Sequence, residues 1–460
     1  MFSRNNLILF FLLLLLLFFG TWHLPQSPAT WFDEGINLGI AKSLVEDGVF
    51  SLKVGPGEFI EARRFLITSN YPVILPAALS LKFFGFNLAA ARAPMVLFLF
   101  LFVLTAYFLT KKLYGKTAAL MSVALIVSFT PFYGNGKNVL GEIPGLFYFL
   151  CALLLLAPES NFKKFVLAGF FIGLSVATKP FFLIVPAAIL VGEIICHRSI
   201  KRIAALALGG ILPIIFWLYT ISPGFSFAGL FSTFSYYSNS YASTEFGSLV
   251  FANFLRFFTE STPIHFLLLF ALFVVFIFWK QKKGEGIKEV EIIFIVFVLL
   301  ALAFYLKTPG WYRYFFPAHV TLFLIFPAAL IYLFNKKTAI VLISALFLFQ
   351  SGYTISQRHT SIYYSDEAEN FSKYVMDSTA LQDKILIING PSAAFLINGR
   401  QIYQYLQINP ILFFGHANAD DYQYIALQGA APDGFKEILE SNYIIQKQIG
   451  HYALYKKSSQ

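Results

Sequence analysis

The stretch RNNLILFFLLLLLLFFGTWHLPQSPATWFDEG, residues 4–35, joins a long apolar run to a pair of acidic residues. The run covers roughly residues 6–24, and about 20 apolar residues suffice to cross a bilayer as a helix. Arg4 precedes the run and no clear small-residue cleavage site follows it, so we expect an uncleaved membrane span rather than a signal peptide. The acidic pair, Asp33 and Glu34, then opens the first long loop.

The rest of the chain has the same apolar character. Of its 460 residues 58% are hydrophobic and only 13% are charged, and 56 are Phe, which excludes an ordinary soluble protein. The apolar runs predict a polytopic α-helical membrane protein with about eleven spans. These spans are expected at roughly residues 6–24, 88–110, 117–133, 143–157, 164–178, 181–196, 202–222, 263–280, 291–308, 315–334 and 338–355.

Lys and Arg indicate the orientation of the chain, because cytoplasmic loops of membrane proteins are enriched in both residues. If the N-terminus lies inside, most of the cations near span ends fall in inner segments. The short outer turns then carry only Lys137, Lys179, Lys307 and Arg313. The net charge of +10 therefore reflects topology, and we expect no nucleic acid partner.

This orientation places two long loops outside the cell, and both belong to a membrane domain that we expect to cover residues 1–355. In the first loop, residues 25–87, apolar residues repeat every four positions from Ile36 to Leu44, which predicts an amphipathic helix at the membrane interface. Tyr71 begins a second apolar piece, which we interpret as another interfacial helix. The second loop, residues 223–262, is rich in Ser, Tyr and Phe, as suits either a loop that orders over a substrate or an idle surface loop.

The tail, residues 356–460, alternates helical and strand patterns and predicts a small extracytoplasmic α/β domain. Helices are expected over residues 366–378, 392–400 and 432–441. Strands are expected over residues 384–390, 401–406 and 421–429, with more in 442–457. No Gly-rich nucleotide-binding pattern is present in the tail.

Several charged residues stand at the outer ends of the predicted spans, where charge beside hydrocarbon is costly and usually functional. They are Arg92, Glu142, Lys179 and Arg313, joined by Arg63 and Arg64 from the first loop. Each also has a purely structural explanation. Arg92 and Glu142 would pair and hold two helices together, and Lys179 would extend its ammonium group to the membrane surface. Arg313 would stack on Tyr312 or Tyr314. As a set on the same face as the acidic pair, they favour a common anionic partner such as a phosphate.

An ordered series of short motifs resembles the GT-C glycosyltransferases. The resemblance is to the bacterial group related to protein O-mannosyltransferases and the lipid A aminoarabinose transferase. The matching pieces are FDEG (32–35), Tyr71-Pro72 leading to FFGFNLAAARAP (83–94), GEIPG (141–145), ATKPFF (177–182) and YRYFFPA (312–318). Each motif is weak alone, but the series runs through nearly the whole chain in order.

The resemblance implies transfer of a sugar from a polyprenyl-phosphate carrier to an acceptor on the outer face of the membrane, usually with inversion. Asp33 matches the family's catalytic aspartate, and a base is needed to take the acceptor proton. Glu34 matches its neighbour, to which we assign positioning of the catalytic group. The leaving phosphate needs cations, for which Arg92, Lys179 and Arg313 are the candidates, with Arg63 and Arg64 as further ones. Glu142 and Tyr71 are candidates for contacting or positioning the acceptor.

The expected partners are therefore a polyprenyl-phosphate-linked sugar, membrane lipids, and a lipid, glycan or protein acceptor. The expected location is the cytoplasmic membrane of a bacterium or archaeon. Members of this family differ over metal dependence. His265 and His319 are the scattered histidines expected on the outer side, but no metal-ligand spacing stands out, so we expect no required metal or other cofactor.

Two other functions remain open for a multi-span protein of this kind. A transporter or flippase of lipid-linked sugars would need ionisable residues near mid-span and matching broken helices. A polysaccharide polymerase or ligase would more naturally centre on outer Arg and His loops. The early carboxylate pair and the charges at span ends favour the glycosyltransferase.

Overall fold

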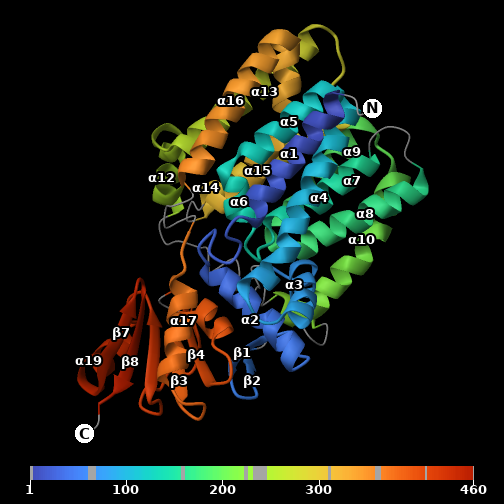
Figure 1. The fold of residues 1–460 in the computed structure, drawn as a ribbon. Helices are drawn as coiled ribbons and strands as arrows, with labels where there is room; N and C mark the ends of the chain where they lie inside the picture. The colour runs from blue at the N-terminus through green and yellow to red at the C-terminus, as the bar shows by residue number, and fades with distance from the viewer. Residues whose placement is uncertain are drawn as a thin grey trace.

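The structure consists of a body of long helices joined to a smaller region built on a β-sheet (Figure 1). It is a computed structural model, and it describes residues 4–60, 69–156, 161–221, 226–231, 246–308, 312–357, 364–409 and 412–458. The two candidate residues Arg63 and Arg64 lie outside these ranges.

Each predicted span corresponds to a helix or a bent pair of helices. The body contains α1 (Arg4–Thr21), α4 (Leu88–Tyr114), α5 (Lys116–Ser128), α6 (Thr130–Gly136), α7 (Glu142–Leu156), α8 (Phe162–Thr178), η2 (Pro180–Leu183), α9 (Ile184–Cys196), α10 (Ile200–Ile221), α13 (Ser261–Lys282), α14 (Glu289–Lys307), α15 (Tyr312–Leu333) and α16 (Lys336–Gln357). Within the described residues, 6 helices are long and apolar enough to cross a membrane, or 7 if α5 and α6 count as one span bent by 67°. The remaining predicted spans correspond to shorter helices.

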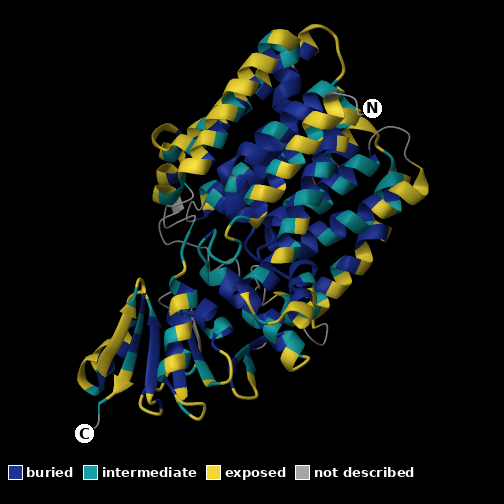
Figure 2. Cartoon of the chain, viewed as in Figure 1, coloured by how far each residue is buried: buried dark blue, intermediate teal, exposed yellow. Residues whose placement is uncertain are grey.

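Burial within the body is highest at its centre (Figure 2). α15 has 83% of its most apolar window buried, whereas α16 has 22%, so α15 is a central helix and α16 lies at the edge. Large apolar side chains such as Phe10, Phe278 and Phe349 are exposed on the outer helices. An apolar outer face of this kind is typical of helices surrounded by lipid.

The first long loop forms two helices and a hairpin. The predicted amphipathic helices are present as α2 (Phe32–Glu46) and α3 (Tyr71–Phe84); their placement at a membrane interface stays a prediction. A short hairpin of β1 (Leu52–Gly55) and β2 (Glu58–Ile60) follows α2, where the sequence indicated only a polar stretch. Its strands are too short, and too close to the Gly-Pro-Gly turn, to show a strand period.

The second long loop is not entirely irregular. Its described part includes α12 (Phe246–Thr259), a helix that the sequence pattern did not indicate. The segment follows a Ser- and Tyr-rich stretch, and the polar-aromatic composition of that stretch obscures the helical spacing of its apolar residues.

The C-terminal region is an α/β unit with a six-stranded sheet in the order β5-β4-β3-β6-β8-β7. The strands are β3 (Lys384–Ile388), β4 (Gln401–Asn409), β5 (Leu412–Gly415), β6 (Tyr424–Gln428), β7 (Tyr443–Ile449) and β8 (Tyr452–Lys457); the helices are α17 (Glu367–Ser378), α18 (Pro391–Leu396) and α19 (Asp433–Asn442). β3 is parallel to both β4 and β6, and the other pairs are antiparallel. All predicted elements of this region are present; β5 was not predicted.

The sheet region is attached to the helical body through the first loop. A Cβ atom on Gly35 of α2 would lie 2.5 Å from the backbone nitrogen of Ser392, so only glycine permits this approach of α2 to α18. Further along α2, Lys42 donates hydrogen bonds to the carbonyls of Phe395 and Ile397. On the sheet itself, the Gln404 amide donates to the carbonyl of Lys53 in β1 at 2.6 Å.

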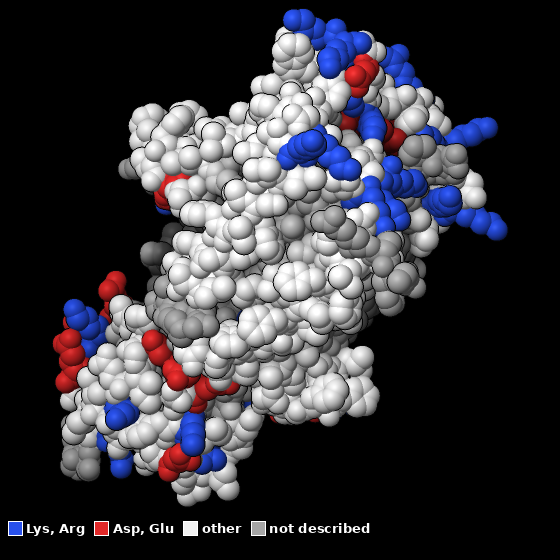
Figure 3. Space-filling model, turned by 45° about the horizontal axis from the view of Figure 1, so that its top comes forward, with Lys and Arg blue, Asp and Glu red and all other residues white. Residues whose placement is uncertain are grey.

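Charge is concentrated at the two ends of the molecule (Figure 3). Lys and Arg gather at the end of the helical body that lies away from the sheet region, and the middle of the visible face carries almost no charged residues. The exposed cations of that far end include Lys111, Lys112, Lys163, Lys164, Lys201, Lys282, Lys283, Lys336 and Lys337. This distribution is the one expected for a membrane protein whose far end faces the cytoplasm.

Candidate functional site

The acidic pair occupies the first turn of α2, where the partial positive charge of a helix N-terminus stabilises carboxylates. The two side chains enter different surroundings because consecutive residues project in different directions from a helix. The Asp33 side chain is 15% exposed, whereas the Glu34 side chain is 0% exposed. Only Asp33 is therefore accessible to a substrate.

Asp33 forms an ion pair with Arg313 in the first turn of α15. The guanidinium lies 5.5 Å from the ring centre of Trp31 and 5.1 Å from that of Tyr314. These rings limit the positions that the guanidinium can take. The Asp33 carboxylate beside it stays partly exposed. The predicted stacking of Arg313 on Tyr314 is thus present together with the ion pair, while Trp31 was not predicted.

A second ion pair joins Glu142 at the start of α7 to Lys179, which lies between α8 and η2. The Lys179 ammonium is 5.4 Å from the ring centre of Tyr314, so this ring lies beside both cations. Lys179 also interacts electrostatically with Asp33 and Arg313, and the two ion pairs form one cluster. Glu142 pairs with Lys179 rather than with Arg92, contrary to the stapling pair considered from the sequence.

The packing around Lys179 explains the glycine of the GEIPG motif. A Cβ atom on Gly145 would lie 2.1 Å from the ring of Phe182, so the ring can rest against α7 only where no side chain intervenes. The motifs GEIPG and ATKPFF therefore form a single packed unit that holds the ion pair. Among the described residues, the second oxygen of Glu142, Oε2, has no hydrogen-bond partner although the side chain is only 2% exposed.

Glu34 and Arg92 form a third, fully buried pair. Arg92 donates from Nε and Nη2 to the two Glu34 oxygens at 2.8 and 2.7 Å, and from Nη1 to the carbonyls of Leu24, Pro25 and Pro28 at 2.9 Å. Every guanidinium nitrogen of Arg92 thus has a protein acceptor, and its side chain is 0% exposed. The predicted phosphate contact of Arg92 does not fit this arrangement, because an external phosphate would first have to displace these acceptors.

The same reasoning separates Glu34 from direct catalysis. Its Oε1 also accepts a hydrogen bond from the backbone N–H of Val139 at 3.1 Å, so both of its oxygens are used. Glu34 instead connects the start of α2 to α4 through Arg92 and to the segment before α7 through Val139. This geometry is compatible with the positioning role expected of Glu34, which stays a prediction.

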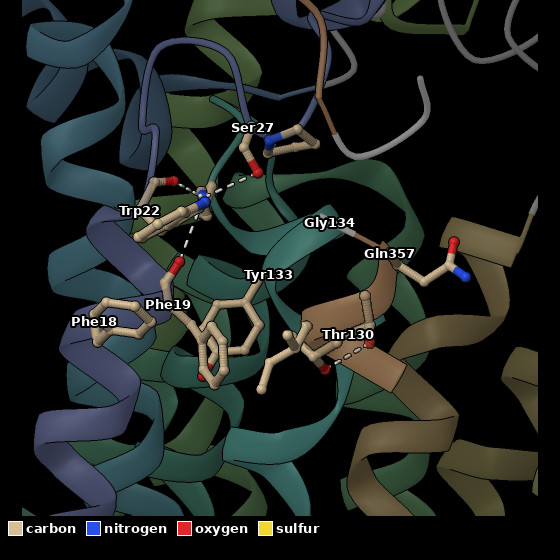
Figure 4. A pocket seen from close by; sticks show the side chains of 12 residues that line it. Phe18, Phe19, Trp22, Ser27, Thr130, Tyr133, Gly134 and Gln357 are labelled. Atoms are coloured by element: carbon tan, nitrogen blue, oxygen red, sulfur yellow. Dashed lines mark hydrogen bonds between the residues drawn. The ribbon is translucent and has the colours of Figure 1, made fainter. Parts of the chain in front are cut away.

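Lys137 is a further buried cation, and it joins the segment after α6 to the end of α1 and to the chain before α2. Its ammonium donates to the carbonyls of Phe19 and Trp22 at 3.4 and 2.8 Å and to the Ser27 hydroxyl at 3.4 Å. Figure 4 shows these contacts beside a small apolar pocket walled by Trp22, Tyr133 and Thr130. Its signal in the sequence, a lone cation in an outer turn, indicates topology but no partner.

Tyr71 lies at the start of α3 and packs on α10. Its hydroxyl donates to the Pro213 carbonyl at 3.3 Å, and its ring meets that of Phe216 edge-on with centroids 4.6 Å apart. The preceding backbone is tied to the Lys179 segment, because the N–H of Asn70 donates to the Thr178 carbonyl at 3.1 Å. Its contacts are those of a packing residue near the cluster.

The two histidines proposed as scattered candidates lie next to each other in the structure. His319 Nε2 is 3.1 Å from His265 Nδ1, and the Tyr312 hydroxyl is 3.0 Å from His319 Nδ1. His319 is fully buried among aromatic rings, including that of Phe129 at 4.8 Å. This network is that of bonded core histidines.

The carboxylates of the cluster are poorly suited to hold a metal ion, because Asp33 and Glu142 each already pair with a basic side chain. Among the described residues, three ligand atoms approach within 4.8 Å of one another at Glu193, His197 and Glu289. These residues stand at the opposite end of α9 from Lys179, and Arg202 pairs with both of the carboxylates there. That transfer requires no metal stays a prediction.

Comparisons with known proteins agree with this architecture. The family model of dolichyl-phosphate-mannose-protein mannosyltransferase matches residues 73–220, while a search of curated protein sequences finds no match. The structure of ArnT from Cupriavidus metallidurans bound to undecaprenyl phosphate is similar with a TM-score of 0.69 and 11% identity, covering 100% of this chain and 99% of that one. The oligosaccharyltransferase of Archaeoglobus fulgidus in complex with Zn and sulfate is similar with a TM-score of 0.60 and 12% identity, covering 92% of this chain and 68% of that one. The chain is thus a multi-pass membrane protein with the GT-C glycosyltransferase fold that its sequence motifs indicated.

Proposed function

We propose that this protein is a membrane glycosyltransferase that moves a sugar from a polyprenyl-phosphate carrier to an acceptor at the outer face of the cytoplasmic membrane. The observation that carries the proposal is the cluster of two ion pairs, Asp33–Arg313 and Glu142–Lys179, beside the start of α2. The matched mannosyltransferase family model supports a sugar donor of this class, as does the similar ArnT structure with its bound undecaprenyl phosphate.

The donor phosphate is expected to bind Arg313 and Lys179. A guanidinium and an ammonium together offer the forked and point-like contacts that phosphate oxygens take. Both cations are paired in the free protein, so an arriving phosphate competes with Asp33 for Arg313. Donor binding would therefore release Asp33 from its partner at the moment when a base is required.

Asp33 is proposed as the general base. It takes the proton of the acceptor hydroxyl while that oxygen forms a bond to the anomeric carbon of the sugar. The bond between the anomeric carbon and the phosphate oxygen breaks, and its electron pair leaves with the phosphate. Because a phosphate is already a good leaving group, cations that stabilise its charge are sufficient and no general acid is needed. A single in-line displacement inverts the anomeric configuration.

Glu142 and the Glu34–Arg92 pair have supporting roles in this proposal. The unbonded Oε2 of Glu142 is suited to accept a hydrogen bond from a sugar or acceptor hydroxyl. The Glu34–Arg92 pair fixes the start of α2 and with it the position of Asp33. We assign the cation-rich far end of the body to the cytoplasm, so in this proposal the cluster and the sheet region lie outside.

The proposal is tested by transfer from a lipid-linked donor. Purified protein in proteoliposomes receives undecaprenyl-phosphate-linked radiolabelled sugars and an envelope extract as acceptor. We expect label to pass to the extract and free undecaprenyl phosphate to accumulate. Empty liposomes and protein inactivated by heat serve as controls.

Two results would contradict the proposal. One is transfer from soluble nucleotide sugars with no use of the lipid-linked donors. The other is movement of intact lipid-linked sugar across the bilayer with no cleavage of its phosphate bond, which would indicate a flippase.

A further inference from the structure

A polar cleft lies where the sheet region meets the first loop, and the proposed chemistry does not use it. It has a volume of about 400 Å³ and is lined from α2, β1, α18 and β4, together with the segment between α3 and α4. Binding sites commonly form at such junctions between units of a protein. Its lining includes Lys42, Lys53, Phe86, Phe395 and Gln404.

The lining offers one buried hydrogen-bond acceptor that no described residue satisfies. The Gln404 amide nitrogen faces the Lys53 carbonyl at 2.6 Å, which fixes the orientation of the amide. Its oxygen, Oε1, then has no partner within the described part of the chain, although the residue is only 6% exposed. A buried acceptor without a donor costs free energy, so a ligand that brings an O–H or N–H group would be favoured there.

The cations around the cleft are already engaged. Lys42 donates to the Phe395 and Ile397 carbonyls and to the Asn398 side chain at 2.6 Å. Lys53 lies 3.0 Å from both carboxylate oxygens of Asp47. Within the described residues, the two lysines of the cleft thus already have protein partners.

Arg400 also lines the cleft, and it too is engaged by protein acceptors. Its guanidinium donates to the Thr379 hydroxyl and to the carbonyls of Met376 and Thr379 at the end of α17. At the rim, the exposed carboxylate of Glu46 adds negative charge. The three described cations of the lining, Lys42, Lys53 and Arg400, thus all have protein partners, which an anionic ligand would first have to displace.

Two aromatic residues complete the lining, and because Phe395 is only 1% exposed, the half-buried Phe86 supplies most of the ring surface that a ligand can contact. The Lys42 ammonium is 5.6 Å from the centre of the Phe86 ring and 6.0 Å from that of Phe395, which places the rings around one point of the cleft. Apolar ring surface together with amide groups suits a ligand that carries both C–H faces and hydroxyl groups. Neutral sugars have this character.

We infer that this cleft binds a neutral saccharide unit of the acceptor, and that the acceptor is therefore a glycan. The inference rests on the proposed glycosyltransferase function. Lys42 follows Asp33 by nine residues on α2, which corresponds to about 14 Å along the helix axis and to its opposite face. A donor sugar that reacts beside Asp33 cannot reach the cleft at the same time, whereas a remote unit of an acceptor chain can.

Binding of sugars to the full-length protein in lipid nanodiscs tests the inference without any donor lipid. The probes are short neutral hexose and N-acetylhexosamine oligosaccharides, with sialylated and phosphorylated counterparts. We expect the neutral probes to bind. Ala394→Phe, which fills the cleft, and Gln404→Leu, which removes the acceptor, should each weaken binding by about tenfold, as expected for loss of one hydrogen bond or of comparable contact.

Matched controls use exposed positions away from the cleft. Ala430→Phe and Gln448→Leu repeat the two side-chain changes there and should leave binding as in the wild type. Should Ala394→Phe fail to fold, Gln401→Trp at the exposed rim blocks the same opening. Unfolding temperatures of all variants show which of them fold.

The outcomes separate this inference from the proposed function. Absence of binding by every probe, binding of anionic probes only, or wild-type binding by the blocked variants would each overturn the saccharide cleft. Undecaprenyl-phosphate binding, measured by native mass spectrometry on the same variants, is expected to be unchanged. If the wild-type protein does not bind undecaprenyl phosphate, that result contradicts the proposed glycosyltransferase function.

Discussion

Asp33 and Glu34 are neighbours in the sequence, yet α2 turns their side chains into two different environments. Asp33 pairs with one side of Arg313 and keeps 15% of its side chain exposed. Glu34 meets Arg92 where both side chains are 0% exposed and the Arg92 nitrogens all have protein acceptors. A buried ion pair with complete hydrogen bonding stabilises the structure. A partly exposed ion pair beside a second ion pair can exchange partners with a substrate.

Asp33→Asn tests the different roles of the two acidic residues most directly, because it removes the carboxylate base and keeps the shape of the side chain. If Asp33 takes the acceptor proton, the turnover rate falls by about 10²–10⁴-fold, the usual contribution of a general base. The measurement is transfer from the undecaprenyl-phosphate-linked sugar in proteoliposomes. Asp433→Asn, at the exposed start of α19, is the matched control and should retain activity. Wild-type turnover by Asp33→Asn would remove Asp33 from the chemistry.

Glu34→Gln should act on stability instead. The change leaves the Arg92 charge buried with no opposite charge, and breaking a buried pair in this way costs about 3–5 kcal/mol. The free energy of unfolding of the purified protein is the measurement. Since exposed pairs contribute about 1 kcal/mol or less, Glu260→Gln on the exposed Arg256–Glu260 pair provides the reference. A Glu34→Gln protein as stable as the wild type but inactive would reverse the two roles.

Much of the architecture follows from local patterns in the sequence. Long apolar runs are sufficient to predict helices in a membrane, since backbone groups there must be satisfied within each segment. The alternation of short apolar and polar segments in the tail likewise predicted its strands and helices. The hairpin β1–β2 and the strand β5 were missed because each has only three or four residues.

The candidate site was harder to predict, because pairing is a long-range property. Sequence position showed that Arg92, Lys179 and Arg313 stand at helix ends, but it did not show which carboxylate each one meets. Arg92 was grouped with the phosphate-binding cations, since its carbonyl partners lie in an irregular segment with no pattern. Lys137 was missed for the same reason.

A smaller effect is expected at the joint between α2 and the sheet region. Gly35→Ala places a Cβ atom 2.5 Å from the Ser392 backbone nitrogen, so α18 has to move away from α2. Such overpacking costs about 1–3 kcal/mol, to be measured as the change in unfolding free energy. Gly434→Ala meets nothing within 4 Å and is the control. Equal stability of the two variants would show that the close contact does not hold the sheet region in place.

The smallest effect is expected from removal of divalent metal. Asp33 and Glu142 are both neutralised by basic side chains, so a cation at the cluster would have to displace Arg313 or Lys179 at considerable electrostatic cost. Incubation with EDTA should therefore leave the transfer rate of the protein unchanged. The similar Archaeoglobus fulgidus oligosaccharyltransferase was solved with Zn, which makes the comparison informative. If EDTA abolishes transfer and added metal restores it, Asp33 and the unbonded Glu142 oxygen become the first ligands to test, and the exposed pair would then act on a metal rather than on the acceptor proton.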